Sequence, residues 1–277
     1  MPAVPRIAHF VHGLRPQTEP FHLVHHLAIE SCRRVLRPDT ILFHHHHLPY
    51  GELWDLVRPH LTLVRVDPVD LVTRTHDERV PDEYRYAHHA DFIRLDALVE
   101  HGGVYADLDT LFLRPLPGDL FDAPFVIGEE DDVPDGRTGA PRPSLCNAVL
   151  LAEPGSAFAR RWRDAMPAAF DGSWSNHSGF LSRALADAHP DEVRVLPRQA
   201  FFPAPFTPDG IRDLLERDAT DTSASYTVHL WAHLWWARDR RDFSAVHAGL
   251  LTIDHVRGAA TTYARLARPF LPELDLW

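Results

Sequence analysis

Two aspartates one residue apart, Asp107 and Asp109, close the stretch HGGVYADLDT at residues 101–110. The apolar run before them predicts a strand, and residues two apart in a strand point to the same side, so the two carboxylates converge. Like charges held this close repel each other unless a cation lies between them. Carboxylate oxygens suit Mg²⁺, Mn²⁺ or Ca²⁺ better than they suit zinc in a thiolate site. The spacing therefore predicts a site for a hard divalent cation.

The chemistry of such a cation follows from its coordination shell. Two carboxylates leave positions for water, for a third protein ligand and for the phosphate oxygens of a substrate. A cation there neutralises a diphosphate and stabilises the charge that develops when the diphosphate leaves. The pair therefore predicts transfer of a group attached to a nucleoside diphosphate. Its place after a buried strand supports this, because ligands of α/β sheets gather at the carboxyl ends of strands.

Asp91 and Arg94 lie three residues apart on the preceding helical segment and so on one face of it. The spacing leaves two interpretations open. The guanidinium could contact a phosphate or a sugar hydroxyl, oriented by the aspartate. Alternatively, the pair is a local salt bridge of the helix.

The elements that must position these residues alternate along the first third of the chain. PRIAHFV, TILFHH and LTLVRV are typical of strands, and the segments between them, residues 18–36 and 51–59, are typical of helices. This alternation predicts an α/β fold with a mostly parallel sheet covered on both faces. The pair Gly102 and Gly103 ends the next helix, since glycine accepts the left-handed conformation of a C-terminal cap.

The rest of the chain continues the same pattern, with strands and helices expected at SLCNAVLLAEPGS, AFARRWRDAM and GFLSRALADA. No repeat, linker or break in composition divides it, so we predict a single domain over residues 1–277. Residues 128–143, GEEDDVPDGRTGAPRP, are acidic, rich in Pro and Gly and without periodicity, which predicts a surface loop. The acids at its start could supply a general base for an acceptor. A solvated charge run is the interpretation we favour for Glu129, Glu130, Asp131 and Asp132.

Composition limits the classes of function. The net charge of -11 argues against binding to the phosphates of a nucleic acid, so we expect no nucleic-acid partner. The two cysteines, Cys32 and Cys146, form neither a disulfide framework nor a zinc motif, which favours a reducing cytoplasm. No stretch reaches a membrane span, and the first residues lack the pattern of a signal peptide. The run of residues 44–47, HHHH, fits a polar strand end better than a metal site.

At this point the residues resemble a known family. ADFIRLDALVEHGGVYADLDTLFLRPL is similar to the sugar-binding segment of DXD-containing glycosyltransferases of family 32. That family includes yeast-type mannosyltransferases, capsular polysaccharide transferases and the glucosylating domains of large clostridial toxins. The opening VPRIAHFVHG, the strand CNAVLLAEPGSAFARRW and the segment VHLWAHLWW resemble the family more loosely. The residues that match its pattern in order and spacing are Asp91, Arg94, Gly102, Gly103, Tyr105, Asp107 and Asp109.

The resemblance implies a GT-A fold, a divalent cation (usually Mn²⁺, otherwise Mg²⁺) and a nucleotide-sugar donor, UDP-linked rather than GDP-linked. It also implies retention of the anomeric configuration. Residues 1–115 would bind the nucleotide sugar, and residues 116–277, with the closing His-x-Trp segment, would face the acceptor. That acceptor would be a glycan, a lipid-linked saccharide or a small molecule.

The resemblance also implies roles for single residues. Asp109 would bind the metal directly, with Asp107 on the side of the ribose or donor sugar and His229 near the metal or diphosphate. Asp91 and Arg94 would act with the two aspartates as the catalytic set and contact donor hydroxyls and diphosphate. Further donor-binding residues would be Phe10, Val11 and His12 around the base, together with Tyr105, Asn147 and Trp231. From the residues alone, His229 and Trp231 are equally consistent with a hydrophobic core.

Two other classes remain open on sequence. A nucleotidyltransferase or phosphohydrolase with carboxylate-held Mg²⁺ would need more clustered carboxylates, and the chain has no G-x-x-x-x-G-K-[ST] loop. A non-catalytic sugar- or metal-binding protein would use the histidines and tryptophans instead. The spacing reveals neither a catalytic nucleophile nor the oligomeric state.

Overall fold

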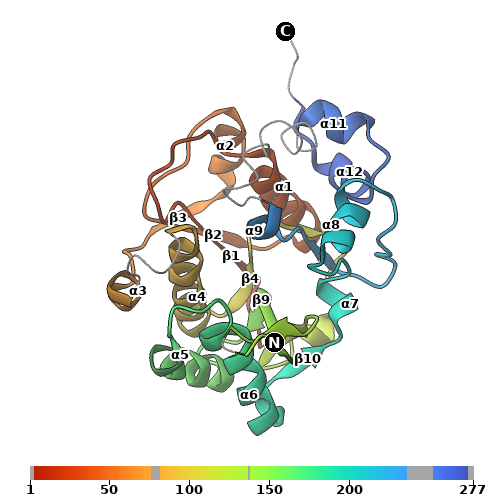
Figure 1. The fold of residues 1–277 in the computed structure, drawn as a ribbon. Helices are drawn as coiled ribbons and strands as arrows, with labels where there is room; N and C mark the ends of the chain where they lie inside the picture. Colours follow the sequence, from red (N-terminus) through yellow and green to blue (C-terminus); the bar gives the residue numbers. More distant parts are fainter. Residues whose placement is uncertain (1–2, 76–81, 137, 236–251, 274–277) are drawn as a thin grey trace.

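The computed structural model describes residues 3–75, 82–136, 138–235 and 252–273 of the chain (Figure 1). Its centre is a seven-stranded sheet. From one edge to the other, the strands are β10 (Arg194–Leu196), β6 (Phe125–Glu129), β9 (Leu145–Ala152), β4 (Gly103–Ala106), β1 (Ile7–His12), β2 (Thr40–His45) and β3 (Thr62–Arg65).

The sheet is mixed but mostly parallel, which confirms the predicted α/β class. β1 is parallel to β2 and to β4, β2 is parallel to β3, and β10 is parallel to β6. β9 alone among these strands is antiparallel, pairing with β4 on one side and with β6 on the other. Because β4 and β6 therefore run in the same direction, their carboxyl ends lie at one edge of the sheet, on either side of the start of β9.

Helices cover both faces of the sheet and enclose two hydrophobic cores (Figure 1). One core contains Phe10 and side chains of the helices α1 (Leu23–Ser31), α2 (Glu52–Val57), α8 (Pro208–Leu215), α11 (Ile253–Gly258) and α12 (Thr262–Ala267). The other contains Val11 and side chains of α3 (Asp70–Thr75), α4 (Asp82–His101), α5 (Ala157–Ala169) and α6 (Leu181–Ala188). Phe10 and Val11 separate in this way because neighbouring strand residues point to opposite faces. The short helix α7 (Arg198–Phe201) follows β10, and the short helix α9 (Ala232–Trp235) follows the strand β11 (Thr227–His229).

A second, two-stranded sheet links distant parts of the chain. β5 (Thr110–Phe112) pairs antiparallel with β11 (Thr227–His229), and the register sets Thr110 opposite His229. This pairing brings a histidine from near the end of the chain to the turn that carries Asp107 and Asp109.

The segment predicted as a loop over residues 128–143 is more ordered than the sequence suggested. β6 extends into it as far as Glu129, and β7 (Val133–Pro134) pairs with β8 (Pro141–Arg142) as a short hairpin. Asp135 holds the hairpin, since its carboxylate accepts from the Thr138 backbone N–H at 2.9 Å and from Arg142 Nη1 at 2.9 Å.

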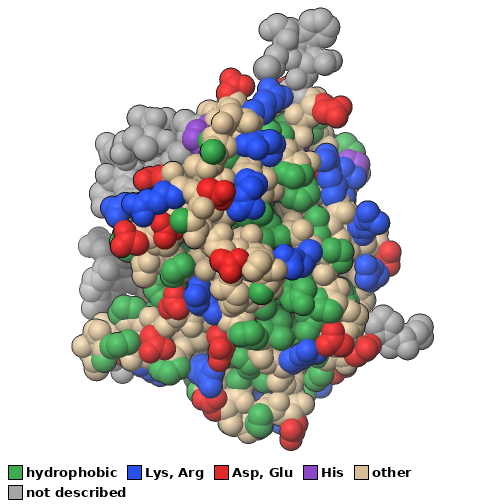
Figure 2. Space-filling view, turned by 90° about the vertical axis from the view of Figure 1, so that its right-hand side faces the viewer, with side chains coloured by type: hydrophobic (Ala, Val, Ile, Leu, Met, Phe, Trp, Pro, Cys, Tyr) green, Lys and Arg blue, Asp and Glu red, His purple; other side chains and the backbone are tan. Residues whose placement is uncertain are grey.

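The surface carries charges of both signs. On the face seen in Figure 2, basic and acidic side chains are interspersed, with apolar side chains exposed between them. Within the described residues, none of the helices combines the length and the apolar character that crossing a membrane requires.

The junction between α4 and β4 depends on two glycines. Gly102 and Gly103 have φ values of 64° and 106°, in the region that disfavours side chains. The Gly102 N–H donates to Leu98 O at 2.9 Å and so caps α4. A Cβ on Gly102 would lie 2.6 Å from Pro154 N and 2.8 Å from Ala152 O, closer than side chains approach backbone. The glycine pair is therefore needed for the path from helix to strand.

We expect Gly102→Ala to lower the free energy of unfolding by about 1–3 kcal/mol, because it adds a side chain at positive φ against backbone atoms. Urea unfolding followed by circular dichroism measures this. Gly118→Ala is the matched control, since a Cβ there has no atom within 4 Å, and it should change stability by less than about 0.5 kcal/mol. Equal effects of the two substitutions would contradict the role given to Gly102.

Candidate active site

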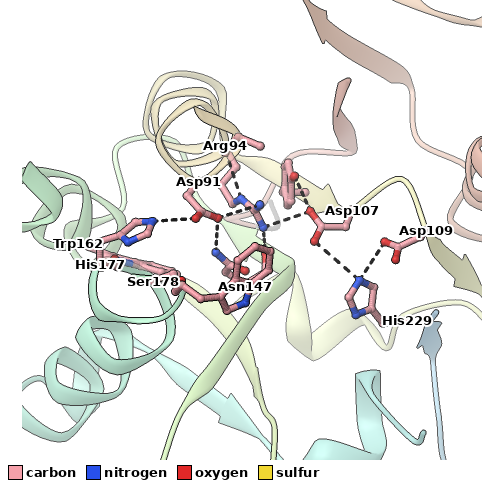
Figure 3. A network of polar contacts seen from close by, with 12 residues as sticks. Asp91, Arg94, Asp107, Asp109, Asn147, Trp162, His177, Ser178 and His229 are labelled. Carbon is pink, nitrogen blue, oxygen red and sulfur yellow. Dashed lines mark hydrogen bonds and ion pairs between the residues drawn. The ribbon is translucent and has the colours of Figure 1, made fainter. Parts of the chain in front are cut away.

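Asp107, Asp109 and His229 converge at the end of β4 (Figure 3). His229 Nε2 lies 2.9 Å from Asp109 Oδ1 and 3.8 Å from Asp107 Oδ2. One potential ligand atom from each of the three residues lies within 4.8 Å of the others, and among the described residues this is the one such group of three. Two carboxylates and an imidazole fit Mn²⁺ or Mg²⁺, so these residues could hold a single hard cation with positions left for a substrate. We call this group the Asp-Asp-His triad.

The turn that carries the aspartates is fixed by the backbone. The Asp107 N–H donates to Ala148 O at 2.8 Å, and the Thr110 N–H donates to Asp107 O at 3.0 Å. Asp109 accepts from the Ala232 N–H at its Oδ2, at 2.7 Å, and its backbone carbonyl accepts from the Leu230 N–H at 2.9 Å. The segment after β11 therefore wraps around Asp109 and sets the direction of its carboxylate.

Trp231 lies at the centre of this segment and packs against His229 of the triad. Its backbone has φ 54°, a left-handed conformation that is uncommon and costly for a tryptophan. The hydrogen bonds of its two neighbours to Asp109 hold it there. Its ring lies 4.4 Å from the His229 ring, centroid to centroid, and its indole N–H donates to Ala204 O at 2.8 Å. At 4% exposure, Trp231 packs against the triad and has little surface for a donor.

The triad holds positive charge readily. Burial raises the pKa of Asp107, and Asp109 adds to this, while Arg94 and His229 oppose it. Burial by itself would lower the pKa of His229, but Asp109, with Asp107 behind it, raises that pKa above its ordinary value. A proton on His229 therefore offsets the negative charge of the two carboxylates, as a bound cation would do. Binding of a metal ion to such groups releases protons.

Arg94 of α4 joins Asp91 to the triad. Its Nη2 lies 3.0 Å from Asp91 Oδ1, and its Nη1 lies 3.2 Å from Asp107 Oδ1 (Figure 3). Nη1 also donates to Asn147 O at 2.7 Å. Although burial lowers the pKa of Arg94, the carboxylates of Asp107 and Asp91 and the nearby Tyr105 raise it overall, so the guanidinium stays charged. The two interpretations of the Asp91–Arg94 spacing are therefore compatible, because the local salt bridge also reaches the Asp-x-Asp turn.

Tyr105 completes the contact between Arg94 and Asp107. The guanidinium lies 4.5 Å from the centroid of its ring, and its hydroxyl donates to Asp107 Oδ1 at 2.7 Å. Tyr105 is 1% exposed. Its observed role is to orient Asp107, and the sequence-based prediction of direct donor contact has no exposed surface to support it.

Asp91 is fully satisfied by three partners. Asn147 Nδ2 donates to its Oδ1 at 2.7 Å, His177 Nε2 lies 2.8 Å from its Oδ2, and Arg94 contacts it as above. Burial tends to raise the pKa of Asp91, but Arg94 and His177 together lower it, so the carboxyl is ionised. Asn147, predicted from sequence, thus enters the site through Asp91.

His177 is the residue of this network that the sequence did not single out. It lies in the short helical segment Asn176–Phe180, and its carbonyl accepts from Trp162 Nε1 at 2.9 Å. Its imidazole meets Asp91 across 86 positions of the chain. The polar run SNHSG between two apolar segments was the one available signal, and no spacing connects it to Asp91.

The end of β1, predicted to cradle a base, lies partly in the core. Phe10 has no exposed surface and belongs to the core, and its contact with a base stays a prediction. Val11 is 9% exposed on the opposite face. His12 lies beside Phe21 and His25, with ring centroids 5.5 and 4.7 Å away. Burial lowers the pKa of His12 to about 4, so it presents a neutral ring at the end of the strand.

Within the run of histidines at residues 44–47, those that lie in β2 have a structural role. His44 Nε2 lies 3.1 Å from His9 Nδ1, and the two rings stack 5.4 Å apart. Burial lowers the pKa of His44 to about 3 and that of His9 to about 4, so both are neutral. Within the described residues, the run contributes to no group of three potential metal ligands.

A mixed, mostly parallel α/β sheet with an Asp-x-Asp turn after β4 and a nearby buried Asp–Arg pair defines the GT-A type of glycosyltransferase predicted from the sequence. Residues 54–132 match the family described as "Glycosyltransferase sugar-binding region containing DXD motif". The chain is also 34% identical over 283 residues to Glucan organizing enzyme 1 of Cryptococcus neoformans var. grubii serotype A, covering 98% of this chain and 72% of that relative. The chain therefore belongs to the DXD-containing glycosyltransferases and is an enzyme of that class.

Solved structures with a similar arrangement are also glycosyltransferases. The galactosyltransferase LgtC, in complex with donor and acceptor sugar analogues, is 17% identical with a TM-score of 0.49, covering 96% of this chain and 98% of LgtC. PaToxG glycosyltransferase is 13% identical with a TM-score of 0.45, covering 96% of this chain and 87% of PaToxG.

The buried position of Arg94 predicts a large effect of its removal. Arg94→Ala should lower the free energy of unfolding by about 3–5 kcal/mol, because it leaves the buried Asp91 and the partly buried Asp107 without their shared cation. Arg212→Ala removes a surface ion pair to Asp209, half-exposed on the arginine side, and should change stability by less than about 1 kcal/mol. Chemical denaturation of the two variants and the parent checks this. A loss for Arg94→Ala no larger than for Arg212→Ala would exclude the bridging role.

Proposed function

We propose that this glycosyltransferase moves a sugar from a nucleoside-diphosphate sugar, preferably UDP-linked, to a saccharide, lipid-linked or small-molecule acceptor. The reaction depends on Mn²⁺ or Mg²⁺ held by Asp107, Asp109 and His229, and it retains the anomeric configuration. The observation that carries the proposal is the convergence of this triad at the carboxyl end of β4, beside the buried Arg94 bridge.

In this proposal the protein supplies a fixed, water-poor setting for a leaving diphosphate. A cation bound by the triad would neutralise the diphosphate and stabilise its departing charge. Asp109 is held in direction by the Ala232 N–H, and Asp107 by Arg94 and Tyr105. Because these groups are oriented before the substrate arrives, little reorganisation is needed during the reaction.

The proposal includes a division of the chain. Residues 1–115 bind the donor, and residues 116–277 face the acceptor. The second part also contributes Asn147 and His229 to the donor site. A cytoplasmic location is also part of it, and support comes from Cys32 and Cys146, which are both free and buried thiols.

A saccharide acceptor is favoured by Trp174. Its side chain is one of the large apolar groups exposed at the surface, at 38%. Its ring lies 6.1 Å from that of His88, which lies 5.0 Å from the ring of His177, the partner of Asp91. Sugar rings pack well on indole faces, because the apolar C–H face of the sugar meets a flat aromatic surface. The fungal relative is named for a glucan, so glucan fragments belong among the acceptors to test.

The metal-dependent step is tested with a panel of UDP- and GDP-sugars. We expect release of nucleoside diphosphate with Mn²⁺ or Mg²⁺ and none after chelation. Asp109→Ala should lower the rate at least ~10²-fold, because the cation loses a ligand. Asp254→Ala, at a carboxylate 86% exposed and remote in sequence from the triad, should leave the rate unchanged. Full turnover in chelator, or pyrophosphate or orthophosphate as the product, would count against sugar transfer of this kind.

The acceptor surface is tested separately. Trp174→Ala should raise the KM for a saccharide acceptor roughly 5- to 100-fold, in line with about 1–3 kcal/mol for loss of a large buried aromatic contact. Hydrolysis of the donor in the absence of acceptor should be unaffected. Leu56→Ala, which removes another exposed apolar side chain, is the control and should alter neither value. An unchanged acceptor KM in Trp174→Ala would place the acceptor elsewhere.

A further inference from the structure

Asp91 and Asp107 share a single guanidinium. Arg94 Nη2 lies 3.0 Å from Asp91 Oδ1, and Arg94 Nη1 lies 3.2 Å from Asp107 Oδ1. The two carboxylates are therefore one guanidinium apart, and both side chains keep some exposed surface, 9% for Asp91 and 27% for Asp107. The sugar of a nucleotide sugar is joined directly to the diphosphate. With the diphosphate at the triad, Asp91 is thus the neighbouring carboxylate that can accept from a sugar hydroxyl.

The Asp91 carboxylate is satisfied but not saturated. Each oxygen of an ionised carboxylate accepts about two hydrogen bonds. Arg94 and Asn147 Nδ2 both contact Oδ1, at 3.0 and 2.7 Å, whereas the described partner of Oδ2 is His177 Nε2, at 2.8 Å (Figure 3). Within the described part of the chain, one acceptor position therefore remains, on the oxygen that faces His177.

His177 sets the direction of that remaining position. The Asp91 carboxyl is ionised and can only accept, so the proton of the 2.8 Å contact lies on His177 Nε2. One hydrogen bond on Oδ2 fixes where the second lone pair of this oxygen points. The direction is kept only if the imidazole itself is held in place.

A cage of rings holds the imidazole of His177. Its ring stacks on that of Phe92 at 6.0 Å between centroids, and it meets Phe170 and His88 edge to face at 4.9 and 5.0 Å. Its backbone carbonyl accepts from Trp162 Nε1 at 2.9 Å. The residue has no exposed surface, so the ring cannot touch a substrate itself.

Packing alone does not explain a histidine at this position. The second ring nitrogen, Nδ1, is buried and has no hydrogen-bond partner among the described residues. A buried polar atom without a partner lowers stability. An apolar side chain of similar volume would fill the space beside Phe92 and Phe170 without that cost. The contact with Asp91 is therefore what the imidazole supplies.

We infer that His177 is a positioning residue for the donor sugar, a role that rests on the proposed function. Its Nε2–H orients Oδ2 of Asp91, so that the remaining lone pair of this oxygen accepts from a hydroxyl of the sugar. The cation and the diphosphate are bound at the triad. His177 therefore contributes to recognition of the sugar and not to recognition of the nucleoside diphosphate.

The test compares each nucleotide sugar with its own nucleoside diphosphate: UDP-glucose and UDP-galactose with UDP, and GDP-mannose with GDP. Calorimetry with Mn²⁺ and without acceptor measures the affinities. His177→Leu, of similar volume and without an N–H, should weaken the best-bound nucleotide sugar roughly 5- to 50-fold and leave its nucleoside diphosphate within about twofold, as expected for loss of one hydrogen bond to a charged group. His177→Gln, whose amide nitrogen can take the place of Nε2, should recover most of the loss.

His26→Leu is the matched control. His26 is also a buried imidazole, 2% exposed, and its Nδ1 lies 3.0 Å from Leu53 O. It belongs to α1, on the other face of the sheet, so the substitution should lower stability while both affinities stay as in the parent enzyme. An equal loss of nucleotide-sugar affinity in His26→Leu and His177→Leu would overturn the role of His177. Equal weakening of nucleotide sugar and nucleoside diphosphate by His177→Leu would do the same.

The parent enzyme gives a readout that does not depend on the folding of a variant. With ¹⁵N-labelled histidine, the Nε2–H resonance of His177 should shift when the nucleotide sugar binds with Mn²⁺ and stay in place when the nucleoside diphosphate binds, because only the sugar shares Oδ2 of Asp91. The same response to both, or none with the nucleotide sugar bound, would overturn the positioning role and leave metal-dependent transfer intact. Absence of metal-dependent binding and turnover with every nucleotide sugar would instead overturn the proposed function.

Discussion

The site depends on one buried cation, the guanidinium of Arg94. It lies between the carboxylates of Asp91 and Asp107, which belong to a helix and to a strand end. A carboxylate taken out of water, fully for Asp91 and in part for Asp107, is unfavourable unless a positive charge and further hydrogen bonds compensate it. Arg94 supplies the charge, and Asn147, Tyr105 and the backbone complete the hydrogen bonds. The position of α4 against β4 and the start of β9 follows from this arrangement.

A mixed sheet is suited to gathering such groups. Parallel strands bring their carboxyl ends to one edge, and an antiparallel strand between two of them brings its amino end to the same place. Asp107 after β4 and Asn147 near the start of β9 meet at Arg94 for this reason. An all-parallel sheet would have left the start of β9 at the opposite edge, away from Asp107.

The third member of the triad, His229, comes from a distant part of the chain. His229 and Asp109 are 120 positions apart, and the pairing of β5 with β11 joins them. Ordering such a loop costs entropy that grows only slowly with its length, so a few well-made contacts can hold it. Here the wrapping of residues 230–232 around Asp109 provides them, and it also maintains the uncommon backbone of Trp231.

The sequence by itself determined the local features: the helix over residues 82–101, the glycine stop, the strand that follows and the Asp-x-Asp turn, because each depends on neighbours within a few positions. The tertiary structure alone decided which side chains meet and which are enclosed. His177 reaches Asp91 across 86 positions, the Glu130 carboxylate accepts from Ser144 across 14 positions, and Phe10 lies in the core. Burial and long-range pairing depend on how sheet edges and helices pack together, and no spacing along the chain records that.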